Sequence, residues 1–528
     1  MVFTKPWAVD LILDLAGYDS AKRLFEQVAL EPSAGDGAFI RAMVRRLVES
    51  CRQHKESLSR AEEALRAFEI DPVTAANAVN AVEAELISLG VSGTTAARLA
   101  RSWVRCEDFL DASLGFPVAD YVVGNPPYVR LEEIPPAKAA LYRNAFHTMR
   151  GRSDLYVAFY EAALMQLKPG GTCAYICADR WLLNDYGSTL RNLITDGFNV
   201  RFIIEAHDVD AFEAEVSAYP AITVISTGKQ GPATVAKLHP GAESADRGQL
   251  LDRLGAAKSD SFLRSARLHQ WFRGAEPWPC SSPERLAVLR QIEASCIPLE
   301  TEETETRVGI GVATGADRIF IPKEVPDVEQ DRLLPLAMGD DLAGPRVNWS
   351  GSYLINPWTE DGLVELNRFP KTHAYLLPHL ETLRGRHTAK DHPAKWHKTI
   401  DRVNLSLVRE RKLYIADIRG RLEPALDKGE TYPHHNIYWI TSKKWDLPVL
   451  GGLLMSDVGE FFVRCYGVRM RGGYFRFQAQ YLRRIRVPHP DSIPASIQEQ
   501  LARAFTDFDR ARATALAHTL YGINALPE

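Results

Sequence analysis

The segment VVGNPPYVR, residues Val122 to Arg130, decides the fold expected for this chain. It starts as a β-branched run and then passes through a glycine into Asn-Pro-Pro-Tyr. Two successive prolines can neither continue a strand nor open the interior of an ordinary helix. The segment therefore predicts a buried strand that ends in a rigid turn, and this turn carries an amide (Asn125) and an aromatic ring (Tyr128).

The surrounding sequence, residues 1–228, alternates short apolar runs with helical patterns. Four runs read as strands that each end in a loop: FEQVALEPSAGDGAF, LRAFEIDP, ADYVVGNPPY and GTCAYICADRW. Between the first two, apolar residues recur at helical spacing from Ile40 to Arg66. Such alternation predicts a parallel sheet covered by helices on both faces, with ligands bound beyond the carboxyl ends of the strands.

The composition narrows the class of protein. The 528 residues are 46% hydrophobic and 25% charged, as in globular proteins. No run of about 20 apolar residues and no secretion signal is apparent, so we expect no membrane segment and a cytoplasmic location. Seven cysteines lack metal-like pairing, and no metal site is expected. The net charge of −4 excludes a protein coated in positive charge but allows a local basic face.

The loop LEPSAGDGAF, residues 30–39, has the features of a ligand-binding turn. Gly35 and Gly37 allow the backbone to approach a ligand closely, and the following helix offers free N–H groups. Glu31 and Asp36 add two carboxylates, which disfavour a phosphate and suit a cationic ligand. The alternative is an ordinary glycine-rich turn.

Two further acidic positions lie between the glycine-rich loop and the Asn-Pro-Pro-Tyr turn. Glu69, in FEIDP, can accept hydrogen bonds from both hydroxyls of a ribose, whereas Asp71 suits the N-cap of the next helix. Asp108, in CEDFLD, could accept from an adenine amino group, and Phe109 could pack on the adenine ring. The alternatives are a solvated acidic turn at Glu69 and a plain loop carboxylate at Asp108.

In this order, the motifs resemble the amino-group DNA methyltransferases that use S-adenosylmethionine. An Asn at the first position of Asn-Pro-Pro-Tyr resembles the N6-adenine branch. FTKPWAVDLILDLA before the glycine-rich loop, and a large domain after the catalytic one, resemble the γ-class, TaqI-like order of restriction–modification enzymes. The resemblance implies an α/β, Rossmann-like S-adenosylmethionine-dependent domain followed by a C-terminal α+β target-recognition domain.

The resemblance also implies two sets of site residues. The cofactor would be bound by Thr4, Glu31, Ser33, Gly35, Asp36, Gly37, Glu69, Ile70, Asp108, Phe109 and Asn125. The catalytic set would be Asn125, Pro126, Pro127, Tyr128 and Phe212. In VDAFEAEVSAYPAITVI, Phe212 and Tyr219 compete as the aromatic that contacts the extruded base. We prefer Phe212, and the alternative for either ring is a place in the core.

The expected chemistry follows from these residues. The amide oxygen of Asn125 and the carbonyl of Pro126 can accept the two hydrogens of adenine N6 and so concentrate its lone pair. Proline fixes the direction of its carbonyl because its φ is locked. A base inside a duplex must be flipped out at a cost of a few kcal/mol, which stacking on Tyr128 and Phe212 would partly offset.

The second half of the chain has a different pattern. Residues 229–276 are expected to form a linker or transitional segment, and residues 277–528 the target-recognition domain. RVGIGVATGADRIFI and LLPLAMGDDLAG resemble the segments that open such domains. Two basic, aromatic-containing stretches, residues 383–399 and 464–486, suit phosphate contacts and readout of guanine. Their candidate DNA contacts are Arg384, Arg386, Lys395, Trp396, Arg469, Arg471, Tyr474 and Arg476.

The sequence thus predicts a site-specific DNA adenine-N6 methyltransferase. Double-stranded DNA would be its partner, bound by a monomer. No room for a nuclease precedes the first motif, so a separate restriction endonuclease or defence protein is expected. Three alternatives stay open: methylation of RNA, methylation of a protein glutamine amide, and a DNA-binding subunit without activity. In the basic stretches, the alternative is a strand pair with solvated arginines.

Overall fold

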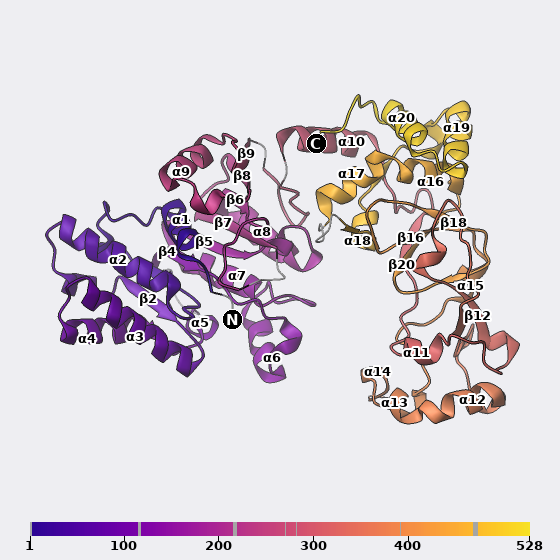
Figure 1. Cartoon of the computed structure of the whole chain (residues 1–528), viewed down its shortest axis with the longest axis horizontal. Helices are drawn as coiled ribbons and strands as arrows, with labels where there is room; N and C mark the ends of the chain where they lie inside the picture. Colours follow the sequence, from indigo (N-terminus) through magenta and orange to yellow (C-terminus); the bar gives the residue numbers. More distant parts are fainter. Residues whose placement is uncertain are drawn as a thin grey trace. The chain divides into compact units, whose positions relative to one another are not determined.

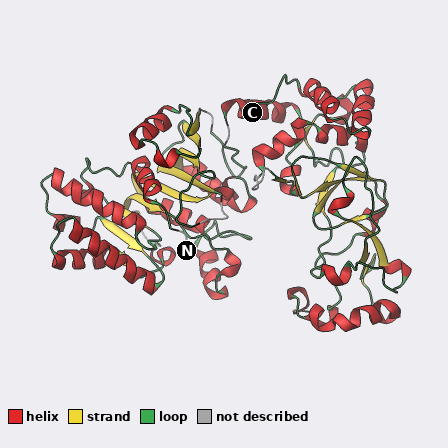
Figure 2. Ribbon diagram, in the orientation of Figure 1, coloured by secondary structure: helices red, strands yellow, loops and turns green. Residues whose placement is uncertain are grey.

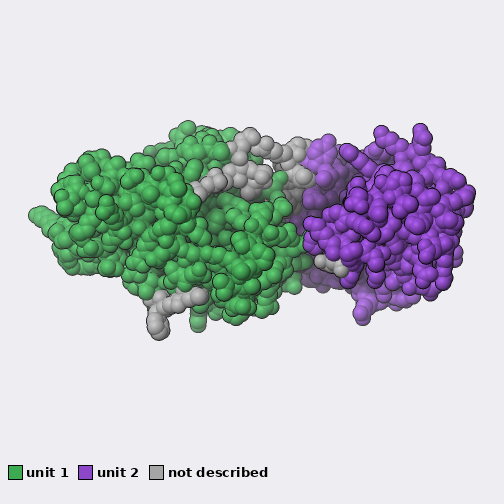
Figure 3. Space-filling model, turned by 90° about the horizontal axis from the view of Figure 1, so that it is seen from below, with its two compact units in different colours: residues 1–283 green, residues 284–528 purple. Residues whose placement is uncertain are grey.

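The computed structural model describes residues 3–113, 118–214, 219–269, 271–280, 282–390, 392–467 and 474–527. The chain divides into two compact units, residues 1–283 and 284–528, which Figure 3 colours separately. Within the described ranges, the helices are too short or too polar to cross a membrane.

The first unit is built on a mixed sheet whose described strands run in the order β3-β2-β1-β4-β5-β7-β6-β8-β9 (Figures 1 and 2). The strands β1 to β5 that neighbour one another pair in parallel, and β7 is antiparallel to both β5 and β6. The strands are β1 (Ala29–Glu31), β2 (Leu65–Phe68), β3 (Val104–Arg105), β4 (Ala119–Gly124), β5 (Leu167–Ala178), β6 (Phe198–Glu205), β7 (Pro220–Thr227), β8 (Ala233–Leu238) and β9 (Leu263–Leu268). The α/β, Rossmann-like prediction is confirmed.

Helices cover both faces of this sheet (Figure 1). They are α1 (Pro6–Ala16), α2 (Ala38–Gln53), α3 (Pro72–Ser88), α4 (Gly93–Trp103), α5 (Phe109–Ala112), α6 (Pro136–Ala145), α7 (Tyr156–Gln166), α8 (Ser188–Gly197) and α9 (Arg247–Ala256). Tyr121 and Val123 share a core with α1 and α2. Because side chains alternate along a strand, Val122 faces the opposite side, where α7 packs on β4 and β5. This burial on both faces explains why β4 is apolar from Tyr121 to Gly124.

Two expectations about the first unit are wrong. The helical spacing from Ile40 to Arg66 predicted one long helix, but α2 ends at Gln53 and Lys55 turns the chain with a φ of 56°. Residues 229–276 are not a linker, because β8 pairs in parallel with β6 and β9 pairs with β8. Each of these strands is only six residues long, and polar residues such as Lys237, Arg264 and Arg267 interrupt its apolar pattern.

The second unit combines small sheets with helices, as the α+β prediction required. Its strands are β10 (Ile297–Pro298), β11 (Arg307–Ile310), β12 (Leu333–Ala337), β13 (Tyr353–Ile355), β14 (Trp358–Thr359), β15 (Gly362–Leu363), β16 (Lys412–Ala416), β17 (Ile418–Arg419), β18 (Ala425–Asp427), β19 (Tyr432–Pro433), β20 (Ile437–Thr441), β21 (Phe475–Arg476) and β22 (Arg486–Val487). Its central described sheet has the order β11-β20-β16-β18, and a second one has the order β13-β12-β19.

The described helices of the second unit are α10 (Pro283–Ser295), α11 (Asp317–Phe320), α12 (Pro370–Leu376), α13 (Leu380–Arg384), α14 (His387–Lys390), α15 (Leu405–Arg409), α16 (Leu447–Met455), α17 (Asp457–Tyr466), α18 (Ala479–Leu482), α19 (Ala495–Thr506) and α20 (Arg510–Tyr521). In the C-terminal part of the unit, α16, α17, α19 and α20 pack together. Glycines 451 and 452 in α16 make close packing possible, since a Cβ there would meet Phe505 or the backbone of Leu501.

Candidate active site

Three predicted site residues stand at one edge of the first unit's sheet. β2, β1 and β4 are parallel neighbours, and Leu30 of β1 pairs with Val122 of β4. Parallel strands end on the same side, so the sheet brings Glu31, Glu69 and Asn125 to its carboxyl edge. Side-chain atoms of Glu31 and Pro32 lie less than 4 Å from the position that a Cβ on Gly124 would occupy.

The glycine-rich loop is tied to the end of β2 by Glu69. One carboxylate oxygen of Glu69 accepts from the Gly35 N–H and the other from the Asp71 N–H, both at 3.0 Å. Gly37 has a φ of 90° at the N-cap of α2, a conformation that L-residues with a Cβ rarely adopt. Asp71 caps α3 by accepting from the Thr74 N–H at 2.8 Å, which confirms the cap prediction.

Glu31 places a carboxyl group in an unusual environment at this edge of the sheet. Its residue is only 1% exposed, and Oε2 has no hydrogen-bond partner among the described residues. Burial raises the pKa of this carboxyl well above its usual range, and the neighbouring carboxylates of Asp36 and Glu69 raise it further. A cationic ligand would stabilise the ionised form, because a buried carboxylate without a partner is costly.

Asp108 has both oxygens engaged. Oδ1 accepts from the Leu110 N–H at 3.0 Å and caps α5. Oδ2 accepts from the Tyr142 hydroxyl and from the Lys138 ammonium, each at 2.5 Å, and both come from α6. An adenine amino group could reach Oδ2 only if one of these α6 side chains moved. Sequence reasoning missed this pair because α6 lies 28 or more residues beyond Asp108.

Other predicted cofactor residues surround the loop. Phe109 is buried, with its ring centroid 5.4 Å from that of Phe68 and 5.6 Å from that of Phe159. Ser33 is half-buried. Asp36 is exposed as a whole residue, but its carboxyl group is partly shielded from water, and this shielding raises the pKa of Asp36. Ile70 is 58% exposed, so its side chain is open to a ligand lying over the strand ends.

The start of the chain meets the catalytic turn. The Asn125 side-chain amide donates to the Thr4 hydroxyl at 3.2 Å. Thr4 forms an antiparallel bridge with Phe212, and the Lys5 N–H donates to the Ala211 carbonyl at 2.9 Å. Both Thr4 and Phe212 are buried. The fold thus brings together three predicted site residues that are 87 or more positions apart in the sequence.

The aromatic residues near the turn differ in the groups that they contact. The Tyr128 hydroxyl is buried without a partner among the described residues, and burial raises its pKa well above the usual range, with Cys177 and Tyr160 adding to the effect. Its ring centroid lies 6.5 Å from that of Tyr156. Tyr219 instead packs edge-on against His207, with centroids 5.0 Å apart. Phe212 is therefore linked to Asn125 through Thr4, while its own ring lies in the core of the first unit.

Comparison with known proteins supplies the family. Residues 85–212 match the family described as Eco57I restriction-modification methylase. The Type II methyltransferase M.XhoI of Xanthomonas vasicola is 41% identical over 99% of this chain and 97% of its own length. M.PaeR7I of Pseudomonas aeruginosa, also a Type II methyltransferase, is 40% identical over 99% of this chain and 92% of its own length.

The chain belongs to the Type II restriction–modification methyltransferases. A solved structure of the Type IIL restriction–modification enzyme MmeI in complex with DNA has a similar fold, with a TM-score of 0.64. It is 13% identical, and the match covers 98% of this chain and 74% of that one. The predicted restriction–modification family is confirmed.

A charged network that sequence reasoning missed supports the methyltransferase sheet beside Tyr219. His207 lies between the carboxylates of Asp179, at 2.8 Å, and Glu205, at 2.9 Å. Burial alone would lower the pKa of His207, but its hydrogen bonds to both carboxylates raise it to about 9. His207 is therefore protonated at neutral pH and joins the ends of β5 and β6.

We expect replacement of His207 by glutamine to lower stability at neutral pH and to flatten its pH dependence. A pKa raised from 6.5 to about 9 gives stability that is complete below pH 6.5 and is lost as the pH rises through 9. The loss is on the order of 3 kcal/mol. Urea unfolding of the wild type and H207Q at pH 6.5 and 9.5 measures it; equal pH dependence in both proteins would contradict this role.

The predicted DNA contacts of the methyltransferase separate into three groups. Arg386 is held inside the second unit, where its guanidinium donates to the carbonyls of Leu383, Thr314, Trp396 and Lys398. Trp396 is a core residue, and Arg476 is paired with Asp417 at 2.5 Å. Arg384, Lys395 and Tyr474 are exposed. Arg469 and Arg471 lie outside the described residues.

The positions of Arg386 and Trp396 thus contradict the prediction that these two residues contact DNA. A single guanidinium that satisfies four backbone carbonyls fixes the loop 383–398, because each unpaired buried carbonyl would be costly. The indole of Trp396 fills the core beneath the same loop. A basic, aromatic sequence stretch has the same composition whether its side chains point to DNA or back into the protein.

Proposed function

We propose that this chain is a site-specific DNA adenine-N6 methyltransferase that uses S-adenosylmethionine. The observation that carries the proposal is the Asn-Pro-Pro-Tyr turn at the end of β4, where Asn125 is held by Thr4, itself bridged to Phe212. The turn stands at the same sheet edge as the buried, partnerless oxygen of Glu31. A cation-accepting site and an amide-bearing turn therefore lie side by side.

The residues at this edge fit S-adenosylmethionine. The ligand carries a sulfonium and an ammonium group, and Glu31 offers a buried carboxylate whose Oε2 has no partner. The glycine-rich loop turns at Gly37 and is tied to Glu69, which stands where a ribose would meet the end of β2. When bound, the cofactor supplies an electrophilic methyl group.

The chain's own residues then have to activate the acceptor. Adenine N6 is a poor nucleophile because its lone pair is delocalised into the ring. The side-chain oxygen of Asn125 and the carbonyl of Pro126 would accept the two N6 hydrogens, and the thiols of this domain have no chemical role. The gain in rate comes from positioning and from dipoles that are oriented before the reaction.

Tyr128 and Phe212 would bind the flipped base between them. The hydroxyl end of Tyr128 is buried. The bridge to Thr4 fixes the backbone of Phe212, but the ring of Phe212 lies in the core of the first unit and would have to turn toward the base. Stacking contributes about 1–3 kcal/mol per base, which offsets part of the cost of flipping. Asp108 would bind the adenine of the cofactor in place of Tyr142 or Lys138.

Methyl transfer to different polymers tests this proposal. Purified protein with labelled S-adenosylmethionine is offered double-stranded DNA of varied sequence, RNA and a protein extract, and the labelled product is identified after digestion. The proposal requires labelled N6-methyladenine from DNA. Labelled glutamine or RNA would favour the alternative substrates, and DNA binding without any methyl transfer would favour a non-catalytic subunit.

The second unit would read the DNA sequence, and the protein would act as a monomer on double-stranded DNA beside a separate restriction endonuclease or defence protein. Support for a DNA partner comes from the family and from MmeI, a similarly folded restriction–modification enzyme solved in complex with DNA. Within the second unit, Arg384, Lys395 and Tyr474 are the exposed candidates for contact.

We expect Arg384→Ala and Arg386→Ala to have opposite signatures, although the residues are two positions apart. Arg384 is exposed, so its loss should weaken DNA binding several-fold and reduce the slope of log K against log salt by about 1. Arg386 holds four carbonyls, so its loss should lower the thermal midpoint by several degrees. Salt-dependent binding titrations and thermal unfolding of both variants measure this; a thermal midpoint unchanged in R386A would contradict it.

A further inference from the structure

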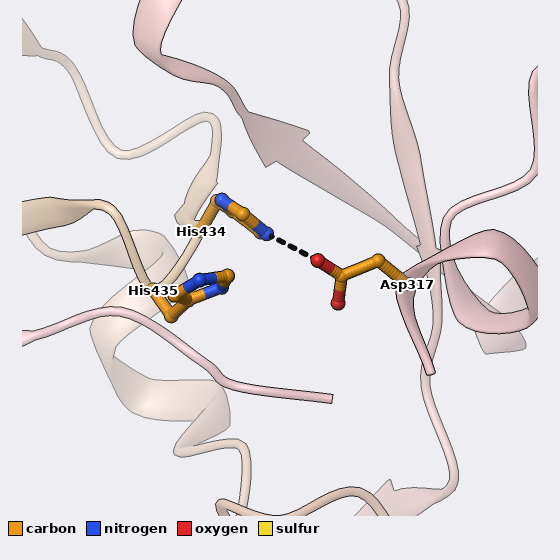
Figure 4. Close-up of side chains that lie close together, drawn as sticks. All are labelled: Asp317, His434 and His435. Atoms are coloured by element: carbon orange, nitrogen blue, oxygen red, sulfur yellow. Dashed lines mark hydrogen bonds and ion pairs between the residues drawn. The ribbon is translucent and has the colours of Figure 1, made fainter. Parts of the chain in front are cut away.

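A cluster of three side chains in the second unit has the composition of a metal site (Figure 4). This cluster consists of Asp317, at the start of α11, and of His434 and His435, which lie between β19 and β20. One potential ligand atom from each residue lies within 4.8 Å of the other two. Asp317 and His434 are 117 residues apart in sequence, so their spacing carries no metal signature.

The backbone fixes the two halves of the cluster beside each other. Val312 forms a parallel bridge with His434, and the Val312 N–H donates to the Pro433 carbonyl at 3.0 Å. The His434 N–H donates to the Ala337 carbonyl at 3.1 Å. The proximity of Asp317 to the two histidines therefore follows from strand pairing rather than from two long side chains meeting on the surface.

Two of the three residues also have partners that leave one atom directed at the cluster. Thr314 donates its hydroxyl to Oδ1 of Asp317, while Oδ2 faces Nε2 of His434 at 3.2 Å. Nδ1 of His434 lies 2.7 Å from the side-chain oxygen of Asn436. Metal-binding histidines commonly donate their second ring N–H to such an oxygen, which fixes the tautomer and the ring orientation.

His434 is shielded from solvent, with 6% of its side chain exposed, whereas the side chain of Asp317 is 46% exposed. A proton on Nε2 of His434 would be donated to Oδ2 of Asp317, and a metal ion bound at Nε2 would take the place of that proton.

The spacing suits a small transition-metal ion. Bonds of 2.0–2.1 Å in a tetrahedral zinc site place neighbouring ligand atoms about 3.3 Å apart, close to the 3.2 Å between Asp317 and His434. His435 is exposed, and its ring centroid lies 4.0 Å from that of His434, so a side-chain rotation can bring it into range. Two imidazoles and one carboxylate favour zinc over calcium or magnesium.

We propose that Asp317, His434 and His435 bind one divalent transition-metal ion, zinc by preference, in the second unit. The ion would join the segment after β11 to the β19–β20 turn and hold this part of the unit together. A cavity of about 670 Å³ borders Asp317 and His435, which leaves a remaining coordination position open to water. The proposed methyl-transfer mechanism uses no residue of this cluster.

Zinc content and thermal stability test this site on the full chain, with any affinity tag removed. The wild type is stripped with a chelator, dialysed against zinc chloride and analysed by elemental mass spectrometry. We expect about one zinc per chain, and a thermal midpoint that rises with zinc and falls again with chelator. The variants D317N and H435A should lose both effects, whereas H392A, which removes an exposed histidine outside the cluster, should keep them.

Cobalt supplies a second readout, because its visible absorption reports nitrogen and oxygen ligands in a site of low symmetry. A cobalt spectrum present in the wild type and H392A but absent from H435A supports the proposal. His435 and the half-exposed side chain of Asp317 can be replaced with little damage to packing, and circular dichroism checks the fold. Zinc uptake by H435A and D317N equal to that of the wild type, or no uptake by the wild type, overturns it.

Discussion

Replacing Asn125 with alanine is expected to reduce methyl transfer by about 10²–10³-fold or more while the protein stays folded. The variant loses the side-chain oxygen proposed to accept an N6 hydrogen, but the Pro-Pro turn that shapes the backbone remains. Single-turnover transfer to a saturating DNA duplex measures the chemical step. Removing the amide also costs the Thr4 hydroxyl its hydrogen bond at 3.2 Å, which contributes about 0.5–1.5 kcal/mol to stability.

The matched control for this prediction is Thr4→Val, which deletes only the hydroxyl that accepts from the Asn125 amide. Thr4 is a positioning residue, so T4V should lower the rate by about tenfold, the cost of one neutral hydrogen bond, with DNA affinity unchanged. If N125A retained most of the wild-type rate, the Asn-Pro-Pro-Tyr turn would not be the catalytic element.

Replacing Glu31 with glutamine is expected to weaken cofactor binding and, at the same time, to raise the stability of the cofactor-free protein. Burial, with Asp36 and Glu69 nearby, raises the pKa of this carboxyl above 4.5 in the folded state. The ionised form therefore costs stability as the pH rises above 4.5, and the neutral amide removes that cost. Loss of the charge should weaken the binding of S-adenosylmethionine by about 10- to 100-fold.

Calorimetric titration with S-adenosylmethionine and thermal unfolding without it, both at pH 8, measure the two effects. Asp14→Asn is a suitable control, because it also neutralises a partly buried carboxylate of the first unit but one paired with Arg46 at 2.6 Å, and it should lower stability instead. A glutamine variant with full affinity would show that Glu31 does not face the cationic ligand.

The residues at the sheet edge could be predicted from sequence because each of them depends only on its own strand and the loop that follows it. Each predicted strand ended in a loop with a distinctive side chain, and parallel pairing alone brings Glu31, Glu69 and Asn125 to one edge. The cap at Asp71 followed from its position just before the next helix. Rigid, short-range features such as these restrict the backbone at each strand end to few conformations.

The errors arose where a side chain's direction depends on distant backbone. Arg386 turns inward because the carbonyls of Thr314 and Lys398 meet it there, and nothing in the basic stretch signals this. The strands β8 and β9 were missed because polar residues such as Lys237, Arg264 and Arg267 interrupt their short apolar patterns. The cluster of Asp317, His434 and His435 forms through a bridge between residues 312 and 434, which periodicity cannot reveal.

The central claim is that this methyltransferase modifies adenine N6 in DNA at a specific sequence, and one measurement tests it most directly. The gene is expressed in a host free of DNA methylation, and the host genome is sequenced by a method that distinguishes N6-methyladenine from N4-methylcytosine. We predict N6-methyladenine at one position of a single recurring sequence, and none in cells that express N125A. N4-methylcytosine, or an unmodified genome despite soluble, cofactor-binding protein, would contradict the claim.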